Sequence, residues 1–181
     1  NKSQVGKHYI SHYTSSGVLG LFPQDLNMWY GTPAQGIAMD DWADDNWDHS
    51  SVDFIGGGSL CILSERRPIL AASMETFGKA PRWGGAWKKF VKENADRWQA
   101  AYMQKTTLPY ETNYLDLDPS VKDPLGQPVI RITAEYKDNE RKIGAFMQDK
   151  AEQYLREAGA VAIQRQPMGA MATSTHAYGG T

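Results

Sequence analysis

Apolar residues recur at helical spacing in two stretches of the chain. In residues 83–105 they lie three or four positions apart, and charged residues fill most of the positions between them. This pattern predicts an amphipathic helix over Trp83–Lys105. A second apolar stripe follows Asp138 and Asn139, either of which can cap a helix, and it stops at Gly159. It predicts a helix from about residue 139 to residue 158.

Other segments carry the patterns of β-strands. The clearest is Val129–Tyr136, in which Ile130, Ile132 and Ala134 share one face. Turns are expected at Asp118–Pro119 and at 123–126, and residues 23–52 show no clean period and predict a long irregular surface excursion. Strands combined with helices of unequal length predict an α+β fold, with a largely antiparallel β-sheet covered by helices on one face. Shorter strands are expected at 18–22, 54–63, 113–118 and 161–165, and within the second of these Gly56-Gly57-Gly58 indicates a bulge or a close backbone approach.

Composition excludes some classes of function. The chain has 181 residues, a length that suits one domain, and its formal charge is −2, whereas a nucleic-acid-binding protein needs a basic face. No apolar run approaches the roughly 18 residues that a membrane-spanning helix requires. The single cysteine, Cys61, allows no disulfide within the chain. We therefore expect a folded domain with no transmembrane segment and no nucleic-acid partner.

His176 is the main candidate for chemistry. It stands in Thr175-His176-Ala177-Tyr178-Gly179-Gly180-Thr181. A histidine titrates near neutral pH and can accept a proton from a substrate hydroxyl, and glycines let a backbone approach a flat or bulky group closely. Taken alone, so short a motif favours a histidine in a surface tail by about two to one.

Three segments, in order along the chain, resemble one family. Val5–His12 resembles a Val-Gly-Lys/Arg-Asn-x-x-x-His segment, and residues 113–128 resemble a strand–turn–strand that precedes a long helix. Thr175–Thr181 resembles a His-x-x-Gly-Gly-Thr signature. All three are similar to parts of the glucose–methanol–choline oxidoreductases, and the order and rough spacing agree across nearly the whole chain. The closest resemblance is to the flavoprotein large subunit of bacterial gluconate- and sorbitol-type sugar dehydrogenases.

The resemblance implies an FAD-dependent enzyme that oxidises a CH–OH group of a sugar, sugar acid or polyol. It implies that His176 is the catalytic base and that Gly179, Gly180 and Thr181 lie at the cofactor. For the gluconate-type subgroup it also implies a cytochrome c subunit, a small subunit, and a periplasmic, membrane-associated complex. None of these follows from composition or spacing.

Two parts of the family pattern are missing from these residues. The Gly-x-Gly-x-x-Gly turn that holds the FAD pyrophosphate is absent, and the family's closing segment, with a second active-site residue, lies beyond Thr181. We therefore expect residues 1–181 to be the C-terminal substrate-binding domain, or a fragment of it, from a longer protein whose FAD-binding half lies elsewhere. The 181 residues alone are expected neither to bind FAD tightly nor to oxidise sugars. His8 stands where the family often has Asn, which leaves its role open.

Two other functions remain open at this point. A non-catalytic carbohydrate-binding domain would use exposed aromatics, for which Trp29, Tyr30, Trp42 and Trp47 in the irregular stretch are suited, whereas Trp87 and Trp98 are assigned to packing. An FAD-containing lyase of the same family would retain the cofactor without net oxidation. No metal site is expected, because the residues with the right chemistry lack the right spacing; these are the pair His8 and His12, the isolated His49, and the acidic positions Asp40, Asp41, Asp44, Asp45 and Asp48.

Overall fold

A five-stranded antiparallel sheet forms the body of the protein. The structure, a computed structural model, describes residues 3–11, 17–28, 30, 36–63, 81–168 and 176–180. The strand order is β2-β3-β4-β1-β7, and every pairing is antiparallel. The strands are β1 (Val18–Leu21), β2 (Gly36–Met39), β3 (Gly58–Leu63), β4 (Trp98–Lys105) and β7 (Ala162–Arg165).

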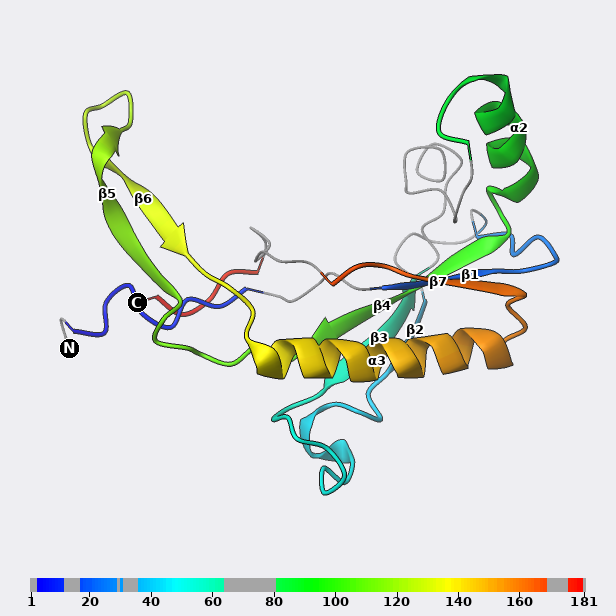
Figure 1. Cartoon of the computed structure of the whole chain (residues 1–181), viewed down its shortest axis with the longest axis horizontal. Helices are drawn as coiled ribbons and strands as arrows, with labels where there is room; N and C mark the ends of the chain where they lie inside the picture. The colour runs from blue at the N-terminus through cyan, green and yellow to red at the C-terminus, as the bar shows by residue number, and fades with distance from the viewer. Residues whose placement is uncertain are drawn as a thin grey trace.

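One long helix, α3 (Asp138–Glu157), lies along one face of this sheet (Figure 1). Its buried positions recur at three- and four-residue steps, so a single stripe faces β1, β3, β4 and β7. The main core lies between the helix and the sheet, and its fully buried side chains include Val18, Leu60, Ala101, Met103, Ile143, Met147, Ala151 and Leu155.

Three smaller elements extend from this body. The hairpin of β5 (Tyr114–Lys122) and β6 (Pro128–Thr133) projects at one end, and helix α2 (Gly84–Asn94) lies at the other end (Figure 1). A 3₁₀ turn, η1 (Asp44–Asn46), belongs to a loop on the side of α3 away from the C-terminal segment. No residue of α2 is buried, whereas the hairpin base adjoins the segments that carry the candidate site.

The predicted α+β fold is confirmed. The second predicted helix agrees with α3, and the predicted strands at 18–22, 129–136 and 161–165 agree with β1, β6 and β7 within a few residues. The expected close backbone approach at the glycine run is also present, because a Cβ on Gly57 would lie 1.9 Å from the Trp42 carbonyl oxygen. The strand predicted from residue 54 begins only at Gly58, and Phe54 packs into the core instead.

The prediction of one helix over Trp83–Lys105 is wrong in its second half. The helix ends at Asn94, and residues 98–105 form β4, hydrogen-bonded to β1 on one side and β3 on the other. Both faces of β4 are buried, because Ala101 and Met103 belong to the core under α3 and Trp98 belongs to a second cluster on the opposite face. Apolar residues on both faces remove the clean alternation that would indicate a strand. Trp98 and Ala101, three residues apart, mimic helical spacing, yet Trp98 is buried within the sheet.

Three further predictions differ from the structure. The turn expected at Asp118–Pro119 is an irregularity inside β5, where the Asp118 carboxylate accepts hydrogen bonds from the N–H groups of Ser120 and Val121. The helix cap expected at Asp138 or Asn139 is at Lys137, and Asn139 instead hydrogen-bonds the backbone of Ile55 in both directions. The irregular stretch 23–52 contains a strand, β2, that was not expected. In the first two cases, a polar side chain bonds backbone groups in another arrangement than the expected one. An Asp or Asn side chain can equally stabilise a turn, cap a helix or anchor a loop, so the sequence does not separate these roles.

Candidate functional site

Three segments that are far apart in the sequence lie side by side at the base of the hairpin. The central one is residues 6–10. On one edge, Tyr9 N–H donates to the Asn113 carbonyl at 2.9 Å, and Leu115 N–H donates to the Gly6 carbonyl at 2.6 Å. On the other edge lies the segment 176–180. The segments that carry the family resemblance therefore converge here.

The pairing with residues 176–180 is antiparallel, and its register shifts after the Ile10–Tyr178 bridge. Ile10 and Tyr178 exchange two hydrogen bonds, at 2.8 and 2.9 Å, and Gly180 N–H donates to the Lys7 carbonyl at 2.9 Å. Gly6 N–H completes the ladder by donating to the Gly180 carbonyl at 3.0 Å. These bonds fix the backbone two residues after His176 and so restrict where its ring can lie.

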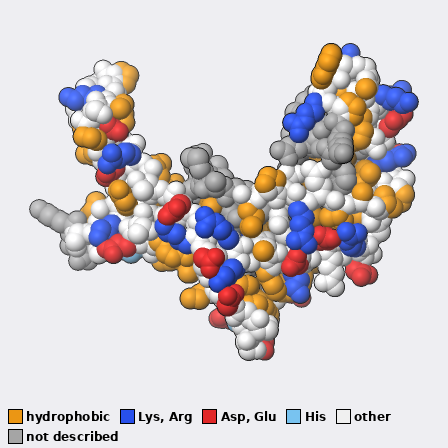
Figure 2. Space-filling model, viewed as in Figure 1, with side chains coloured by type: hydrophobic (Ala, Val, Ile, Leu, Met, Phe, Trp, Pro, Cys, Tyr) orange, Lys and Arg blue, Asp and Glu red, His pale blue; other side chains and the backbone are white. Residues whose placement is uncertain are grey.

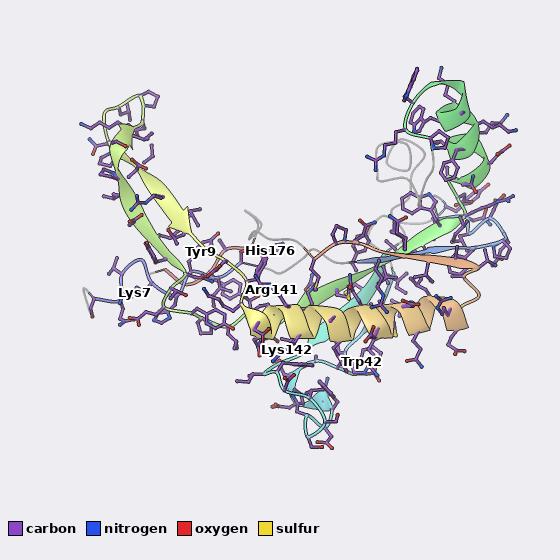
Figure 3. The ribbon with its side chains drawn as sticks, in the orientation of Figure 1. Lys7, Tyr9, Trp42, Arg141, Lys142 and His176 are labelled. Atoms are coloured by element: carbon purple, nitrogen blue, oxygen red, sulfur yellow. The ribbon has the colours of Figure 1, made fainter. Side chains whose placement is uncertain are left out.

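His176 is exposed and has a φ of 55°, in the left-handed region that few non-glycine residues adopt. Figure 3 shows His176 and Trp42 on opposite sides of α3. The predicted catalytic residue thus lies at the surface, held by the backbone pairing that follows it. A proton acceptor at this position can reach a ligand that covers residues 176–180.

Gly179 and Gly180 are required by the protein's own packing. Gly179 has a φ of 74°, and a Cβ on it would lie 2.0 Å from the His8 carbonyl oxygen. Gly180 has a φ of 81°, and its Cβ would lie 3.0 Å from the Leu115 side chain. Both glycines therefore let the last segment lie close against residues 6–10 and β5.

The backbone N–H groups around these glycines bear on whether a cofactor fits here. Within the described residues, the N–H groups of Ala177 and Gly179 make no backbone hydrogen bond, while those of Tyr178 and Gly180 are paired. Ala177 and Gly179 are exposed, so this stretch of backbone is open to a bound group. An exposed, glycine-containing segment with such donors is compatible with a flavin. The cofactor contacts predicted for Gly179 and Gly180 stay predictions, and Thr181 lies outside the described residues.

His8 supports the loop next to the site. Its φ is 59°, and its ring nitrogens lie 2.8 Å from the Pro109 carbonyl and 3.0 Å from Gln4 Oε1. Both ring nitrogens are therefore engaged by the chain itself. Nearby, Lys7 pairs with Glu111, and this hydrogen bond lowers the pKa of the Glu111 carboxyl. His12 lies outside the described residues.

A buried carboxylate that the sequence reading missed anchors this loop. Glu140, in the first turn of α3, is fully buried and accepts hydrogen bonds from Leu108 N–H at 3.0 Å and from Lys137 N–H at 2.9 Å. It also accepts a hydrogen bond from Tyr110, and burial together with the charge of Glu140 raises the pKa of Tyr110 to about 12. No clear signal in the sequence indicates this role, because a capping box pairs Glu with a Ser or Thr three residues earlier, whereas that position here is Lys137.

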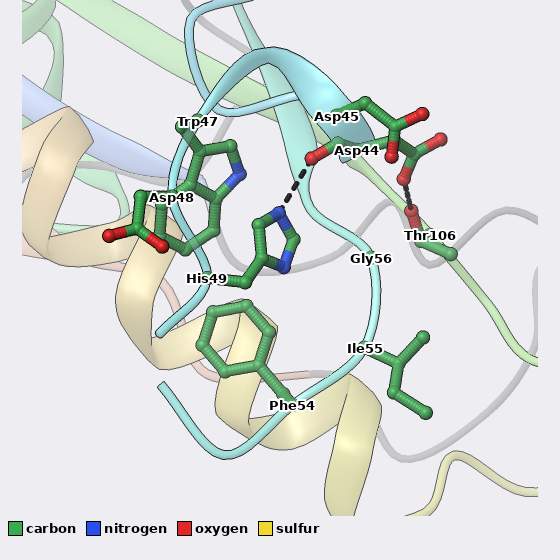
Figure 4. A pocket seen from close by; sticks show the side chains of 9 residues that line it. All are labelled: Asp44, Asp45, Trp47, Asp48, His49, Phe54, Ile55, Gly56 and Thr106. Atoms are coloured by element: carbon green, nitrogen blue, oxygen red, sulfur yellow. Dashed lines mark hydrogen bonds between the residues drawn. The ribbon is translucent and has the colours of Figure 1, made fainter. Parts of the chain in front are cut away.

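A separate pocket lies on the other side of the molecule. Its volume is about 720 Å³, and Trp47, His49 and Phe54 line it with the acidic residues of the η1 loop (Figure 4). His49 Nε2 lies 2.6 Å from the Asp44 carbonyl oxygen, and the His49 ring stacks 4.2 Å from Trp47. Trp47 thus lines a cleft, as its place in the irregular stretch predicted. Trp29 lies outside the described residues.

Two other kinds of site are not found in the described part of the chain. No group of three or more His, Cys, Asp or Glu side chains there is arranged to hold a metal ion. None of the helices in that part is long and apolar enough to cross a membrane.

Comparison with known proteins relates the chain to dehydrogenases. No family model matches it. It is 30% identical over 153 residues to the gluconate 2-dehydrogenase flavoprotein of Pantoea cypripedii, a match that covers 83% of this chain and 24% of that protein. It is 32% identical over 108 residues to the 2-methyl-1,2-propanediol dehydrogenase of Mycolicibacterium austroafricanum, covering 60% of this chain and 20% of that protein. The chain therefore spans about a quarter or less of the length of these relatives, and it is similar to oxidoreductases of which one is named a flavoprotein.

Proposed function

We propose that this chain is the substrate-side domain, or part of it, of an FAD-dependent oxidoreductase that oxidises a CH–OH group of a sugar, sugar acid or polyol. The observation that carries the proposal is the convergence of residues 6–10, 113–115 and 176–180 at one place, with His176 exposed beside them. The names of the two relatives support the substrate class, because gluconate and 2-methyl-1,2-propanediol both contain hydroxyl-bearing carbons.

His176 has the part of general base in this proposal. A neutral imidazole at His176 accepts the proton of the substrate hydroxyl, so that the oxygen gains alkoxide character as the neighbouring C–H bond is broken. The bound flavin supplies the acceptor for the hydride that leaves this carbon. Tyr178 and Gly180 position the imidazole through their hydrogen bonds to Ile10 and Lys7. The N–H groups of Ala177 and Gly179 are the donors available to acceptor atoms of a group lying over the segment.

The rest of the assembly belongs to the same proposal. The FAD-binding half is expected in another part of a longer polypeptide, since these residues hold no pyrophosphate-binding glycine motif. Electrons are expected to pass to a cytochrome c subunit in a periplasmic complex, as the resemblance implies. An electron acceptor in the assay also separates the oxidoreductase from a lyase, because a lyase turns over without reducing the acceptor.

The test is His176→Ala in the complete, flavin-loaded enzyme. We expect kcat for gluconate or a 1,2-diol to fall by roughly 10²–10⁴-fold, the usual contribution of a general base. The value of kcat/KM should fall by the same factor and flavin content should be unchanged, because only the transition state is affected. His176→Asn should be nearly as slow, since an amide donates a hydrogen bond but cannot take up the proton.

His49→Ala is the matched control, because His49 lies in the separate pocket and bonds only the loop that carries it within the described contacts. Its kcat should stay close to that of the wild type. If His176→Ala keeps more than about a third of wild-type kcat, which lies outside the general-base range, the assignment of His176 is wrong.

A further inference from the structure

One face of the β5–β6 hairpin is apolar and open to solvent. The antiparallel register pairs Leu115 with Ile132 and Leu117 with Ile130. Directly opposed residues of two paired strands point to the same side, so these four side chains form one surface, here called the apolar face. Leu117, Ile130 and Ile132 are 62%, 66% and 57% exposed. Figure 2 shows hydrophobic side chains on this projecting part of the molecule.

The other face of the hairpin is polar. Tyr114 lies opposite Thr133, and Asp116 lies opposite Arg131. Arg131 Nε donates to Asp116 Oδ1 at 2.8 Å, with a second, shorter bond between the same side chains. Because a slip of one residue would exchange the two faces, this ion pair and the apolar pairs favour the same register. The apolar face is thus a consistent feature of the sequence pattern.

Beyond its base, the hairpin has little support from the described part of the chain. Within the described residues, β5 and β6 pack extensively only on each other, and the hairpin projects from the body of the protein (Figure 1). A two-stranded hairpin is at best marginally stable in water, and a contiguous exposed apolar patch marks an interaction site. The apolar face is therefore expected to be covered by another surface.

The length of the relatives indicates what covers the apolar face. The matched dehydrogenases are about four to five times as long as the part that corresponds to this chain, since the matches cover 24% and 20% of their lengths. Gly180, in the segment that carries the candidate site, packs against Leu115, a member of the apolar face. The apolar face therefore lies beside the candidate site, where the flavin-bearing part of the proposed longer polypeptide meets this domain.

We propose that the apolar face of the hairpin docks onto an apolar surface of the remaining part of the same polypeptide. The hairpin then acts as a clamp between the two parts of the enzyme, next to the segment that carries His176. This inference rests on the proposal that the chain is part of a longer flavoprotein, but it does not depend on the role of His176.

The test is the reactivity of engineered thiols in the complete natural polypeptide. Ile130→Cys places a thiol on the apolar face, and Thr133→Cys places one on the polar face of the same strand. Each purified protein is treated with a charged maleimide, and the labelled peptides are quantified by mass spectrometry, which keeps the signal of Cys61 separate. We expect Cys at 130 to react at least about ten times more slowly than Cys at 133, because a buried thiol is inert. The protection should not change on dilution.

Several results would overturn the proposal. Equal labelling at the two positions, fast or slow, would show that the faces do not differ in cover. Protection that disappears on dilution would assign the face to a second copy of the protein, and protection found only when another subunit copurifies would assign it to that subunit. A natural polypeptide no longer than these 181 residues would contradict the inference directly. Activity is not the readout, so failure of the docking proposal and failure of the proposed function are distinguishable.

Discussion

Glu140 is the residue whose removal should damage the protein most. Its side chain is fully buried, and its two carboxylate oxygens accept from different donors: Oε1 from Leu108 N–H at 3.0 Å and Oε2 from Lys137 N–H at 2.9 Å. Tyr110 adds a third hydrogen bond. The carboxylate therefore joins the first turn of α3 to the loop that leads into β5.

Substitution by Ala removes all three bonds and leaves buried donors without a partner. Hydrogen bonds to a charged group contribute about 1.5–3 kcal/mol each, and they are not additive, so we expect Glu140→Ala to lower the free energy of unfolding by about 3–5 kcal/mol. In Glu140→Gln one oxygen becomes an NH₂ group, which faces a backbone donor instead of accepting from it. Its expected cost is about 1.5–3 kcal/mol, because one of the two backbone bonds is lost.

Urea unfolding followed by tryptophan fluorescence measures these differences. Glu157→Ala is the matched control, since Glu157 is in the same helix and exposed, and a surface change of this kind is worth within about 0.5 kcal/mol. The slope of the free energy against urea should stay the same in all variants. The reasoning is refuted if Glu140→Ala loses less than about 1 kcal/mol, below the cost of one unpaired buried donor, or no more than the control.

Two further predictions concern the site and the sheet. Gly179→Ala brings a Cβ to within 2.0 Å of the His8 carbonyl oxygen at a φ of 74°. The hydrogen-exchange protection of the Ile10 and Tyr178 amides should therefore fall by about tenfold or more. The control is Gly85→Ala, whose Cβ meets nothing within 4 Å and should leave this protection unchanged. Burial lowers the pKa of Lys105 from 10.5 to about 7, so above pH 7 the unfolded chain binds more protons than the folded one, and stability should rise from pH 7 to about 9.5. The rise has an upper bound of about 3.5 kcal/mol over this pH interval, and a Lys105→Met variant that retains the same rise in urea unfolding would show that Lys105 is not its cause.

Helix α3 was predictable because it has a single buried face, and strand β6 was predictable because its apolar and polar residues alternate. The stripe of α3 meets the sheet at Ile143, Met147, Ala151 and Leu155, and its period alone identifies the helix. The strand β4 was not predictable in this way, since Trp98 and Met103 are buried on both faces of a central strand. Because apolar residues lie on both faces, the sequence of β4 lacks the two-residue alternation that would separate it from a helix.

The candidate site was likewise predictable only in part. His176 and the glycines after it could be found from the sequence because they form a compact motif. Their partners could not, since the pairing of Ile10 with Tyr178 and of Gly6 with Leu115 connects distant segments through backbone atoms, which leave no side-chain signature. Glu140 could not be identified as a buried carboxylate from the sequence, because its burial depends on a donor from a loop that precedes the helix by about thirty residues.

The position of residues 6–10 between two later segments has a consequence for how the protein is made. This segment is synthesised well before its partners, which are residues 113–115 on one edge and residues 178–180 on the other. At ribosomal rates of roughly 5–20 residues per second, Ile10 waits on the order of 10–30 s for Tyr178 to appear. During that interval its backbone donors and acceptors are open to water or to a chaperone. Closure of so long a loop is also among the slow steps of folding. The placement of His176 is therefore completed after the body of the domain, and an interruption of synthesis before residue 176 leaves residues 6–10 without the partner on this edge.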